Sequence, residues 1–364
     1  MTGQCPVTGG LSRRGLFGSA IGAAVAAPSA ALLVGAAQAD DEPVAAGAAG
    51  AELPAAYPFE GPHQAGILTP QQRAAAYVAF DVTALDRHQL MAALKELTEV
   101  SRFLTKGGTP PDAGLAGTAW DSGVLGPEIP ADGLTVTASV GAGLFDDRFG
   151  LARVKPARLR TMEDFPNDDL DRSACDGDLL LQLGAHHPDT VAAALRVLMR
   201  HTRGALQVRW RRDGFLSPPR PSGSPRNLLG FKDGTGNPDV TDDDLMSQLA
   251  WCRAGGGEPT WVEGGSYHVV RVIRMFVEFW DRVSVREQQR IIGRDRATGA
   301  PLTMTGEFDD PSYQLDPTGE VIPFDAHIRL ANPRDEGSND QRMVRRSFNY
   351  DAGTDVNGQL DMGL

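Results

Sequence analysis

Apolar and polar residues follow two regular spacings along residues 75–215, and together they predict six elements. Strand-like apolar patterns occur over residues 75–83, 134–145, 178–186 and 206–215, and the stretch 134–145 alternates between apolar and polar positions. Helical spacing of apolar residues occurs over 86–104 and 188–205, and Asp86 stands where a helix N-cap is expected. The order β-α-β-β-α-β is that of the ferredoxin-like split unit, an antiparallel sheet with both helices on one face.

A second series of elements is expected after residue 220. Residues 266–279, SYHVVRVIRMFVEF, have the apolar character of a strand, 283–294 have helical spacing, and 345–352 are a further candidate strand. The chain ends at Leu364, before the helix and strand of about 12 and 5 residues that would complete a second split unit. We therefore expect an α+β protein of two ferredoxin-like domains with antiparallel sheets, the second C-terminally incomplete unless the elements are counted wrongly.

The first residues have the features of an export signal. Arg13 and Arg14, in SRRGLF, precede an Ala-rich apolar run that ends in Ala37-Gln38-Ala39, an A-x-A cleavage signal. The arginine pair resembles the twin-arginine signal. The alternative, a membrane anchor, is disfavoured because the run is rich in Ala and Gly and contains Pro28, and no other run is long enough to span a bilayer.

The expected organisation is therefore a twin-arginine signal peptide over residues 1–39, a flexible leader over 40–56, a first domain over 57–220 and a second over 221–364. The twin-arginine machinery is an expected partner, since its route carries folded proteins to a periplasmic or other extracytoplasmic location. The 35 basic and 47 acidic residues give a net charge of −12, which disfavours a nucleic-acid partner. Beyond the signal peptide, Cys175 and Cys252 allow one disulfide or two buried thiols, and form no C-x-x-C motif.

Candidate chemistry lies in two loops. Residues 227–238, NLLGFKDGTGNP, place one carboxylate, Asp233, on a Gly-rich loop. Taken alone this stretch indicates a surface turn, because Asp-Gly and Asn-Pro are turn dipeptides. His327 lies in the second loop, PFDAHIRLANPR, and Arg345 and Arg346 follow it.

These loops resemble those of the dye-decolorizing (DyP-type) haem peroxidases. Gly230-Phe231-Lys232-Asp233-Gly234 matches the family's G-x-x-D-G motif, which a histidine follows well downstream, with an arginine shortly after it. The resemblance covers residues from about 57 to the end, and the export signal is similar to that of the subgroup that includes the periplasmic peroxidase/deferrochelatases of bacterial iron uptake. Further stretches match in character: GPHQAGI, VTASVGAGLF, SPRNLLGFKDGT, WVEGGSYHVVRVIRM, AHIRLANPR and GQLDMGL.

The resemblance implies one haem b per chain, with His327 as the proximal iron ligand. Asp233 would be the distal general base and acid, and Arg345, with Arg346 as the adjacent alternative, would stabilise negative charge on the departing oxygen and pair with a propionate. His63 and His268 are the rival ligands, and either Asp325 or Asp340 is near enough in sequence to hydrogen-bond the His327 ring. The remaining implied haem contacts are Gly234, Thr235, Gly236, Asn332, Pro333 and Arg334.

The implied function is that of a peroxidase, in which hydrogen peroxide oxidises organic donors such as dyes or phenolics through a ferryl intermediate. The alternative is a deferrochelatase, which would use the same pocket to release iron from haem with the porphyrin left intact. A simple haem carrier is disfavoured, because carriage requires neither Asp233 nor Arg345. The expected partners are hydrogen peroxide and a small organic or haem substrate, with a homo-oligomer possible and neither nucleic acid nor a stable membrane span expected.

Overall fold

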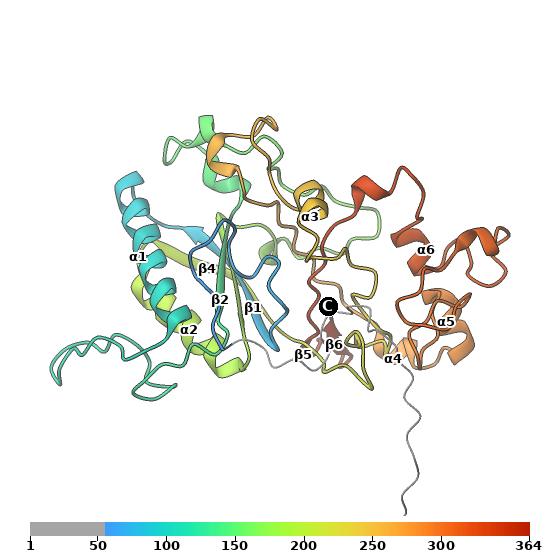
Figure 1. The fold of residues 1–364 in the computed structure, drawn as a ribbon. Helices are drawn as coiled ribbons and strands as arrows, with labels where there is room; N and C mark the ends of the chain where they lie inside the picture. Colours follow the sequence, from blue (N-terminus) through green and yellow to red (C-terminus); the bar gives the residue numbers. More distant parts are fainter. Residues whose placement is uncertain (1–54) are drawn as a thin grey trace, which may run out of the picture. The chain divides into compact units, whose positions relative to one another are not determined.

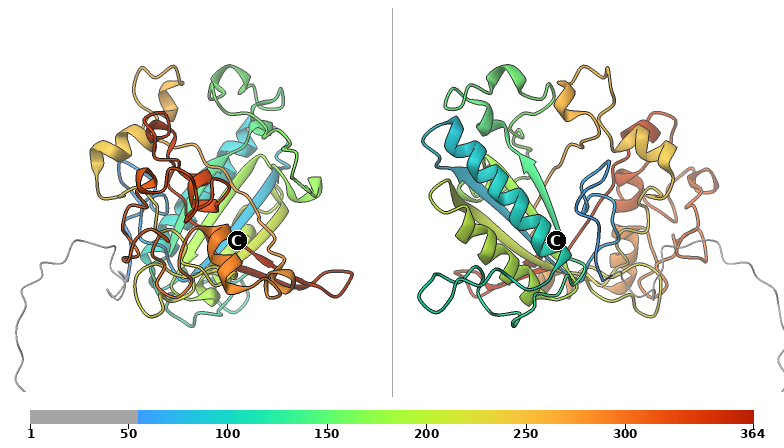
Figure 2. Two further views of the ribbon diagram at one scale, coloured as in Figure 1. Left: turned by 90° about the vertical axis from the view of Figure 1, so that its right-hand side faces the viewer. Right: turned by 60° about the vertical axis from the view of Figure 1, so that its left-hand side comes forward.

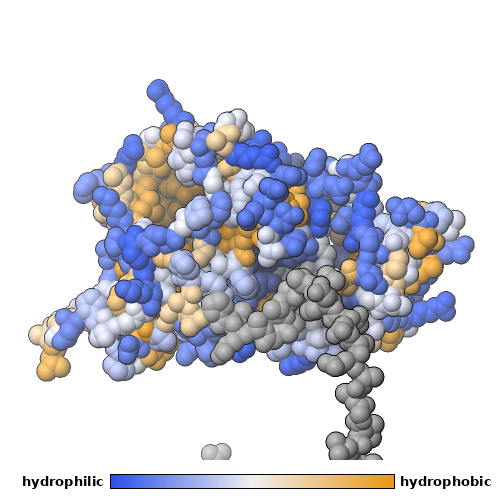
Figure 3. Space-filling model, in the orientation of Figure 1, coloured by the Kyte–Doolittle hydropathy of each residue, from blue (hydrophilic) through white to orange (hydrophobic). Residues whose placement is uncertain are grey.

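The structure is a computed structural model that describes residues 55–364, all of which belong to one compact unit (Figure 1). The expected signal peptide, 1–39, and nearly all of the expected leader, 40–56, lie outside the described residues. No helix of the described part is both long and apolar enough to cross a membrane. The face drawn in Figure 3 is mainly hydrophilic, in keeping with the acidic composition.

The six elements predicted for the first region are confirmed. They form one antiparallel sheet of order β2-β3-β1-β4, and Figure 2 shows α1 and α2 side by side on one face of it. This arrangement is the ferredoxin-like split unit. The elements are β1 (Ala74–Val82), α1 (Arg87–Lys106), β2 (Thr135–Val140), β3 (Leu179–Ala185), α2 (Pro188–His201) and β4 (Leu206–Phe215).

The burial of each strand follows from its place in the sheet. The central strand β1 is almost wholly buried, whereas the edge strand β4 alternates between half-buried and exposed positions along its whole length. Asp86 caps α1 as expected, since its carboxylate accepts a hydrogen bond of 2.8 Å from the Gln89 backbone N–H. One face of the sheet packs on the helices, while the other contributes Tyr77, Thr137 and Gln182 to a large cavity.

The second predicted strand is shorter than expected. It ends at Val140, which is paired with Leu179, the first residue of β3, so that the ladder has no further partner. The chain then turns into a 3-10 helix, Ala142–Phe145. The disulfide alternative is wrong, because Cys175 and Cys252 are both free.

The second region contains short helices and long loops. Its described elements include a two-stranded antiparallel sheet, so the expected α+β class with antiparallel sheets is confirmed. The helix predicted over 283–294 is α5, with Ser284 as its N-cap and Gly293 as a left-handed C-cap. The elements are α3 (Asp243–Leu249), α4 (Val277–Trp280), α5 (Val285–Ile292), α6 (His327–Ala331), β5 (Tyr350–Thr354) and β6 (Leu360–Gly363).

The strand predicted over residues 266–279 is wrong. Within this stretch only residues 273–275 pair with another segment of the described chain, namely residues 362–364. Its last part, Val277–Trp280, is helical. A strand requires a neighbour for its backbone hydrogen bonds, and an apolar pattern alone does not supply one. The strand predicted over 345–352 begins only at Tyr350, although Asn349 makes two backbone hydrogen bonds with Phe215 at the end of β4.

Candidate active site

The loop of residues 227–238 is shaped by the side chain of its first residue. The Asn227 carbonyl oxygen Oδ1 accepts hydrogen bonds from the backbone N–H groups of Leu229 (3.1 Å) and Phe231 (3.3 Å). Gly230 has a φ of 84°, a left-handed conformation that favours glycine. Phe231 is buried and anchors the loop, so that Asp233 is presented just beyond an apolar anchor.

A buried ion pair lies beneath this loop. The ammonium group of Lys232 is 3.3 Å from Glu307 Oε2, and the two side chains are 1% and 11% exposed. Glu307 Oε1 also accepts hydrogen bonds from the Ser224 backbone N–H (2.8 Å) and the Thr235 hydroxyl (3.3 Å). A Cβ at Gly299 would lie 2.6 Å from the Lys232 side chain. The loop is therefore fixed to the segment 299–307 by polar contacts.

Asp233 is half-buried and is held through both carboxylate oxygens. Oδ1 accepts a hydrogen bond of 3.2 Å from the Ser347 hydroxyl, and Oδ2 accepts one of 3.3 Å from the Asn227 amide. Its backbone N–H donates to the Pro225 carbonyl at 2.9 Å. Within residues 55–364, Asp233 makes no ion pair, so its carboxylate is oriented by neutral donors.

Arg345 is positioned through its backbone. The side-chain amide of Asn237 donates to the Arg345 carbonyl at 2.7 Å and accepts from the Arg345 N–H at 3.0 Å, as a neighbouring strand would. The Arg345 guanidinium itself has no ion pair or hydrogen bond to any described residue, and the residue is exposed to the cavity.

His327 is the first residue of α6, and it is accessible from the cavity. Desolvation lowers the pKa of its imidazole below the usual value of 6.5. The Asp233 carboxylate opposes this effect, and the cations Arg345 and Arg294 lower the pKa further. The structure therefore brings Asp233 and Arg345 within electrostatic range of His327 and favours the neutral imidazole.

The helix that carries His327 is tied to a buried carboxylate. Asp316 accepts hydrogen bonds from the backbone N–H groups of residues 320–322 and lies 3.6 Å from Arg329, which is on α6. Desolvation alone would raise the pKa of Asp316, but these hydrogen bonds and the Arg329 charge together hold it below its usual 3.8. The Arg329 guanidinium also lies 4.8 Å from the Tyr313 ring centre.

All of the predicted site residues line one cavity of about 1690 Å³. Its volume exceeds the roughly 300–1,000 Å³ of an ordinary small-molecule pocket. Polar groups from both loops and one face of the first sheet therefore line a space with the volume for more than one small ligand. The predicted residues on its wall are Asp233, Gly234, Thr235, Gly236, His327, Asn332, Pro333, Arg334 and Arg345.

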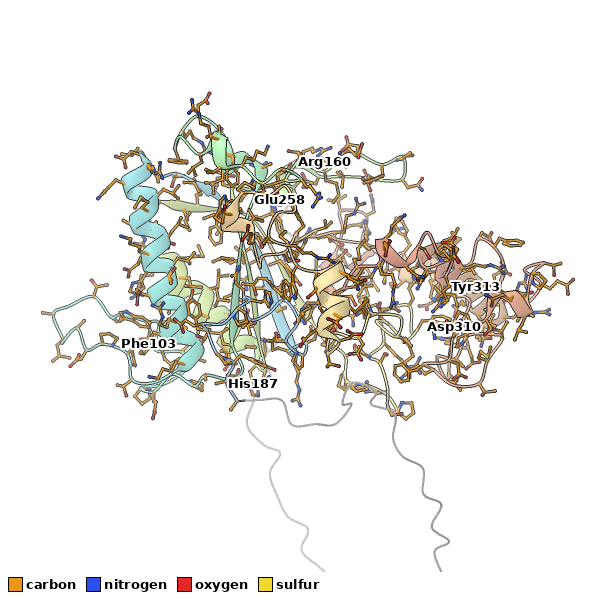
Figure 4. The ribbon with its side chains drawn as sticks, turned by 45° about the horizontal axis from the view of Figure 1, so that its top comes forward. Phe103, Arg160, His187, Glu258, Asp310 and Tyr313 are labelled. Atoms are coloured by element: carbon orange, nitrogen blue, oxygen red, sulfur yellow. The ribbon has the colours of Figure 1, made fainter. Side chains whose placement is uncertain are left out.

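Arg334 already has an ionic partner. Its Nε donates to Asp310 at 3.0 Å and its Nη1 donates to the Tyr313 hydroxyl at 3.2 Å. Figure 4 shows Asp310 and Tyr313 near each other and far from Phe103 on α1. Its φ of 57° is unusual for a residue other than glycine. A haem propionate would therefore compete with Asp310 for this guanidinium.

The rival histidines have other partners. His63 stacks on Trp251 with ring centres 3.6 Å apart, and its Nδ1 is 2.7 Å from the Gly264 carbonyl oxygen. His268 lies on the cavity wall, with its Nδ1 3.3 Å from the Ser139 hydroxyl, and burial lowers its pKa.

Sequence reasoning missed the residues that orient the site. No hydrogen bond within residues 55–364 joins His327 to Asp325 or Asp340, the two carboxylates considered for it. The orienting groups that the structure shows act on the other two residues: Asn227 and Ser347 hold Asp233, and Asn237 holds Arg345. Their proximity to Asp233 and Arg345 in the sequence was the available signal.

Comparison with known proteins places this architecture in a family. The protein-family model described as "Dyp-type peroxidase, N-terminal" matches residues 64–216, and the family model "Dyp-type peroxidase, C-terminal" matches residues 224–364. A protein named deferrochelatase from Yersinia pestis is 53% identical over 311 residues, which are 84% of this chain and 72% of the relative. The deferrochelatase of Escherichia coli strain K12 is 52% identical over 312 residues, covering 84% of this chain and 74% of the relative.

Solved structures agree. A DyP-type peroxidase from Cellulomonas bogoriensis superposes with a TM-score of 0.74 at 36% identity, over 85% of this chain and 82% of the other. DtpA from Streptomyces lividans, solved as an oxyferrous complex, gives a TM-score of 0.74 at 35% identity, over 86% and 83%. This chain belongs to the Dyp-type peroxidase family. It is a peroxidase whose cofactor is haem. The neutral imidazole of His327, on a cavity of ample volume, has the chemistry of the iron ligand that such a site requires.

Proposed function

We propose that the chain reduces hydrogen peroxide at a haem held by His327 and passes the oxidising power to small organic donors such as dyes or phenolics. The observation that carries the proposal is that His327, Asp233 and Arg345, from separate segments, line one cavity, where the charges of Asp233 and Arg345 act on His327. Haem, when bound, supplies the redox chemistry. The three side chains supply a ligand, a proton acceptor and a fixed positive charge.

His327 supports iron ligation because its lowered pKa leaves the imidazole neutral near pH 7. A metal ligand must be deprotonated, so a neutral ring binds without first losing a proton. The contacts of Asp316 and Arg329 hold α6, and with it the position of the ring.

Asp233 accepts a proton from one peroxide oxygen and returns it to the other. The hydrogen bonds from Asn227 and Ser347 fix the carboxylate in one orientation, and its half-buried position leaves it open to the cavity. A general base must lie within hydrogen-bonding reach of the proton that it removes, and a fixed carboxylate meets that requirement without reorganisation.

Arg345 stabilises the negative charge that develops as the O–O bond breaks. Its guanidinium is permanently charged and has no competing partner in the described part of the chain, since the contacts of Arg345 with Asn237 use only its backbone. The remaining proposed haem contacts are less uniform. Gly236 faces open space, whereas the Thr235 hydroxyl is hydrogen-bonded to Ser224 and the Arg334 guanidinium is hydrogen-bonded to Asp310.

The test is an absorption spectrum of the haem-loaded chain before and after one equivalent of hydrogen peroxide. We expect a rapid spectral change that is lost or slowed at least a hundredfold in Asp233→Ala and Arg345→Leu, and an altered ferric spectrum in His327→Ala. Arg271→Leu, which removes another cavity-lining arginine, is the control. A normal peroxide reaction in Asp233→Ala and Arg345→Leu would remove both roles.

A second candidate function is deferrochelatase activity, which the name of the relatives at 52–53% identity favours. The measurement is the fluorescence of iron-free porphyrin after incubation with haem under reducing conditions, with trapped ferrous iron assayed alongside. Equal molar release of both supports the activity. A porphyrin signal no greater than that of haem without protein would exclude it.

Export and organisation are also proposed. The Arg13-Arg14 pair supports twin-arginine export to an extracytoplasmic location, which a double Arg→Lys substitution should block in a cell-fractionation assay. The family-model ranges support domains over 57–220 and 221–364, for which limited proteolysis near residue 220 is the test. Sedimentation equilibrium tests whether the chain forms a homo-oligomer.

A further inference from the structure

Arg346 is a cation that has no anionic partner among the described residues. Its Nη1 donates to the Thr69 carbonyl oxygen, but its Nε and Nη2 are buried and have no hydrogen-bond partner among the described residues. It forms no ion pair within residues 55–364, although it lies on the wall of the large cavity. Burying an unpaired charge is costly, and most buried polar groups have partners.

The two unsatisfied atoms define a direction. Nε and Nη2 lie on the same edge of the guanidinium plane, and this edge donates two parallel N–H bonds to a carboxylate. The opposite nitrogen, Nη1, is the one already used by Thr69. The free edge is thus the edge suited to bidentate recognition.

The surroundings of Arg346 are aromatic and contain further donors. Its charge acts on Tyr57 and Tyr77, and the Tyr57 hydroxyl is also buried without a partner in the described chain. Desolvation raises the pKa of Tyr77 to about 12, so its hydroxyl stays protonated and able to donate. The Tyr77 ring centre lies 6.1 Å from that of His268 and 6.2 Å from that of Phe348.

This group is separate from the proposed haem ligand. The charge of Arg345 acts on His327, whereas the charge of Arg346 acts on His268 and the two tyrosines. The two neighbouring arginines therefore serve different parts of the same cavity. The Arg346 part is formed with the sheet, since Tyr77 is on β1.

We propose that Arg346, with Tyr57 and Tyr77, binds the carboxylate of a small aromatic acid on the sheet side of the cavity. The guanidinium edge receives the carboxylate, the phenol groups donate to it, and the rings of Tyr77, His268 and Phe348 contact the aromatic part. The cavity volume of about 1690 Å³ allows such an acid and haem to be held together.

The test is calorimetric titration of the purified chain with benzoate, without peroxide, and with benzamide as the neutral probe of the same shape. We expect benzoate to bind at least tenfold more tightly than benzamide. Arg346→Met and Arg346→Lys should each bind benzoate at least tenfold more weakly, because neither side chain has the planar pair of N–H donors of a guanidinium. The control, Arg271→Met, removes a cavity-lining arginine that is already paired with Asp168 and should bind benzoate normally. Equal affinities for benzoate and benzamide, or normal benzoate binding in Arg346→Met, would overturn the proposal.

Two further measurements keep the result decisive. If Arg346→Met does not fold, Tyr77→Phe is used in its place. We expect Tyr77→Phe to bind benzoate severalfold more weakly, and an unchanged affinity would overturn the proposal. The titration is repeated after haem is added. Retained benzoate binding supports a separate acid site, whereas loss of binding means that a haem propionate occupies Arg346 and overturns it. Because no peroxide is used, failure of the proposed peroxide reaction does not affect this outcome.

Discussion

The first and second regions of the chain are stabilised in different ways. The first, residues 74–215, has a continuous apolar core between a four-stranded sheet and two long helices, and the main hydrophobic cluster contains residues from this region alone. The second has short helices whose connections are fixed by buried polar groups such as Lys232 with Glu307 and Asp316 with Arg329.

The difference separates stability from function. The free energy gained by burying apolar groups is proportional to the buried area and does not depend on orientation, so apolar burial suits a scaffold. Hydrogen bonds and ion pairs are directional, so they suit the loops that carry the candidate site residues Asp233, His327 and Arg345. Substitutions in the first region should therefore change the free energy of unfolding, and those in the second should also change the site.

The largest loss of stability is expected in the apolar core. Phe80→Ala removes a side chain that is 2% exposed and should lower the free energy of unfolding by about 3–5 kcal/mol. Urea unfolding followed by circular dichroism measures it. Leu85→Ala, at a position 89% exposed, should change it by less than about 0.5 kcal/mol. A comparable loss in both variants would contradict the core assignment.

A slightly smaller loss is expected from the buried ion pair. Glu307→Gln leaves the Lys232 ammonium buried without its counter-charge and should cost about 3 kcal/mol. Because the pair also supports the Asp233 loop, the peroxide reaction should slow as well. The double variant Lys232→Met/Glu307→Leu should recover most of the stability, as paired buried charges are often replaceable by apolar groups. If the double variant is less stable than the single one, the pair is itself stabilising.

Asp316→Asn should lose about 2 kcal/mol near neutral pH, because the charged acceptor of three backbone N–H groups is removed. The folded-state pKa of Asp316 is below 3.8, so its stabilising contribution is fully present above 3.8 and disappears as the pH falls through the lower folded-state value. The stability difference from the unsubstituted chain should thus shrink in acid. Thermal unfolding at several pH values measures it, and a difference that grows in acid would contradict the assignment.

The smallest effect on stability is expected at Asn237. Asn237→Ala removes the two hydrogen bonds to the Arg345 backbone and should cost about 1 kcal/mol. The peroxide reaction should slow about tenfold, since a small displacement of a catalytic group is costly in rate. Asn357→Ala, on the exposed β5–β6 turn, is the matched control. An unchanged rate in Asn237→Ala would show that Arg345 needs no such support.

The sequence predicted the first region well because each strand there has both an apolar pattern and a partner. Over β4 the alternation is complete, and the pairing with β1 gives it a ladder. Residues 266–279 have an equally apolar pattern but few partners, and Val269 and Ile273 are 60% and 53% exposed. Periodicity reports what a segment can bury, whereas strand formation depends on a distant neighbour that the pattern does not contain.

The candidate site shows the same division. Asp233, His327 and Arg345 were found from motifs, and the structure places them on one cavity. Asn227, Asn237 and Ser347 lie near Asp233 or Arg345 in the sequence, but the contacts of Asn237 and Ser347 join residues 108 and 114 apart, which no local pattern records. Arg346 was considered only as an alternative to Arg345, and its separate surroundings emerge from the three-dimensional arrangement alone.

The bridge between Asn237 and Arg345 also bears on how the chain tolerates change in length. It closes a loop of 108 residues, and the entropy of closing a loop grows only logarithmically, by about 0.6 kcal/mol for each doubling. A few residues inserted at the exposed Gly255–Gly257 turn, inside this loop, should therefore leave the unfolding midpoint nearly unchanged. Insertions can therefore be tolerated at this turn while the Asp233 carboxylate and the Arg345 guanidinium keep their positions.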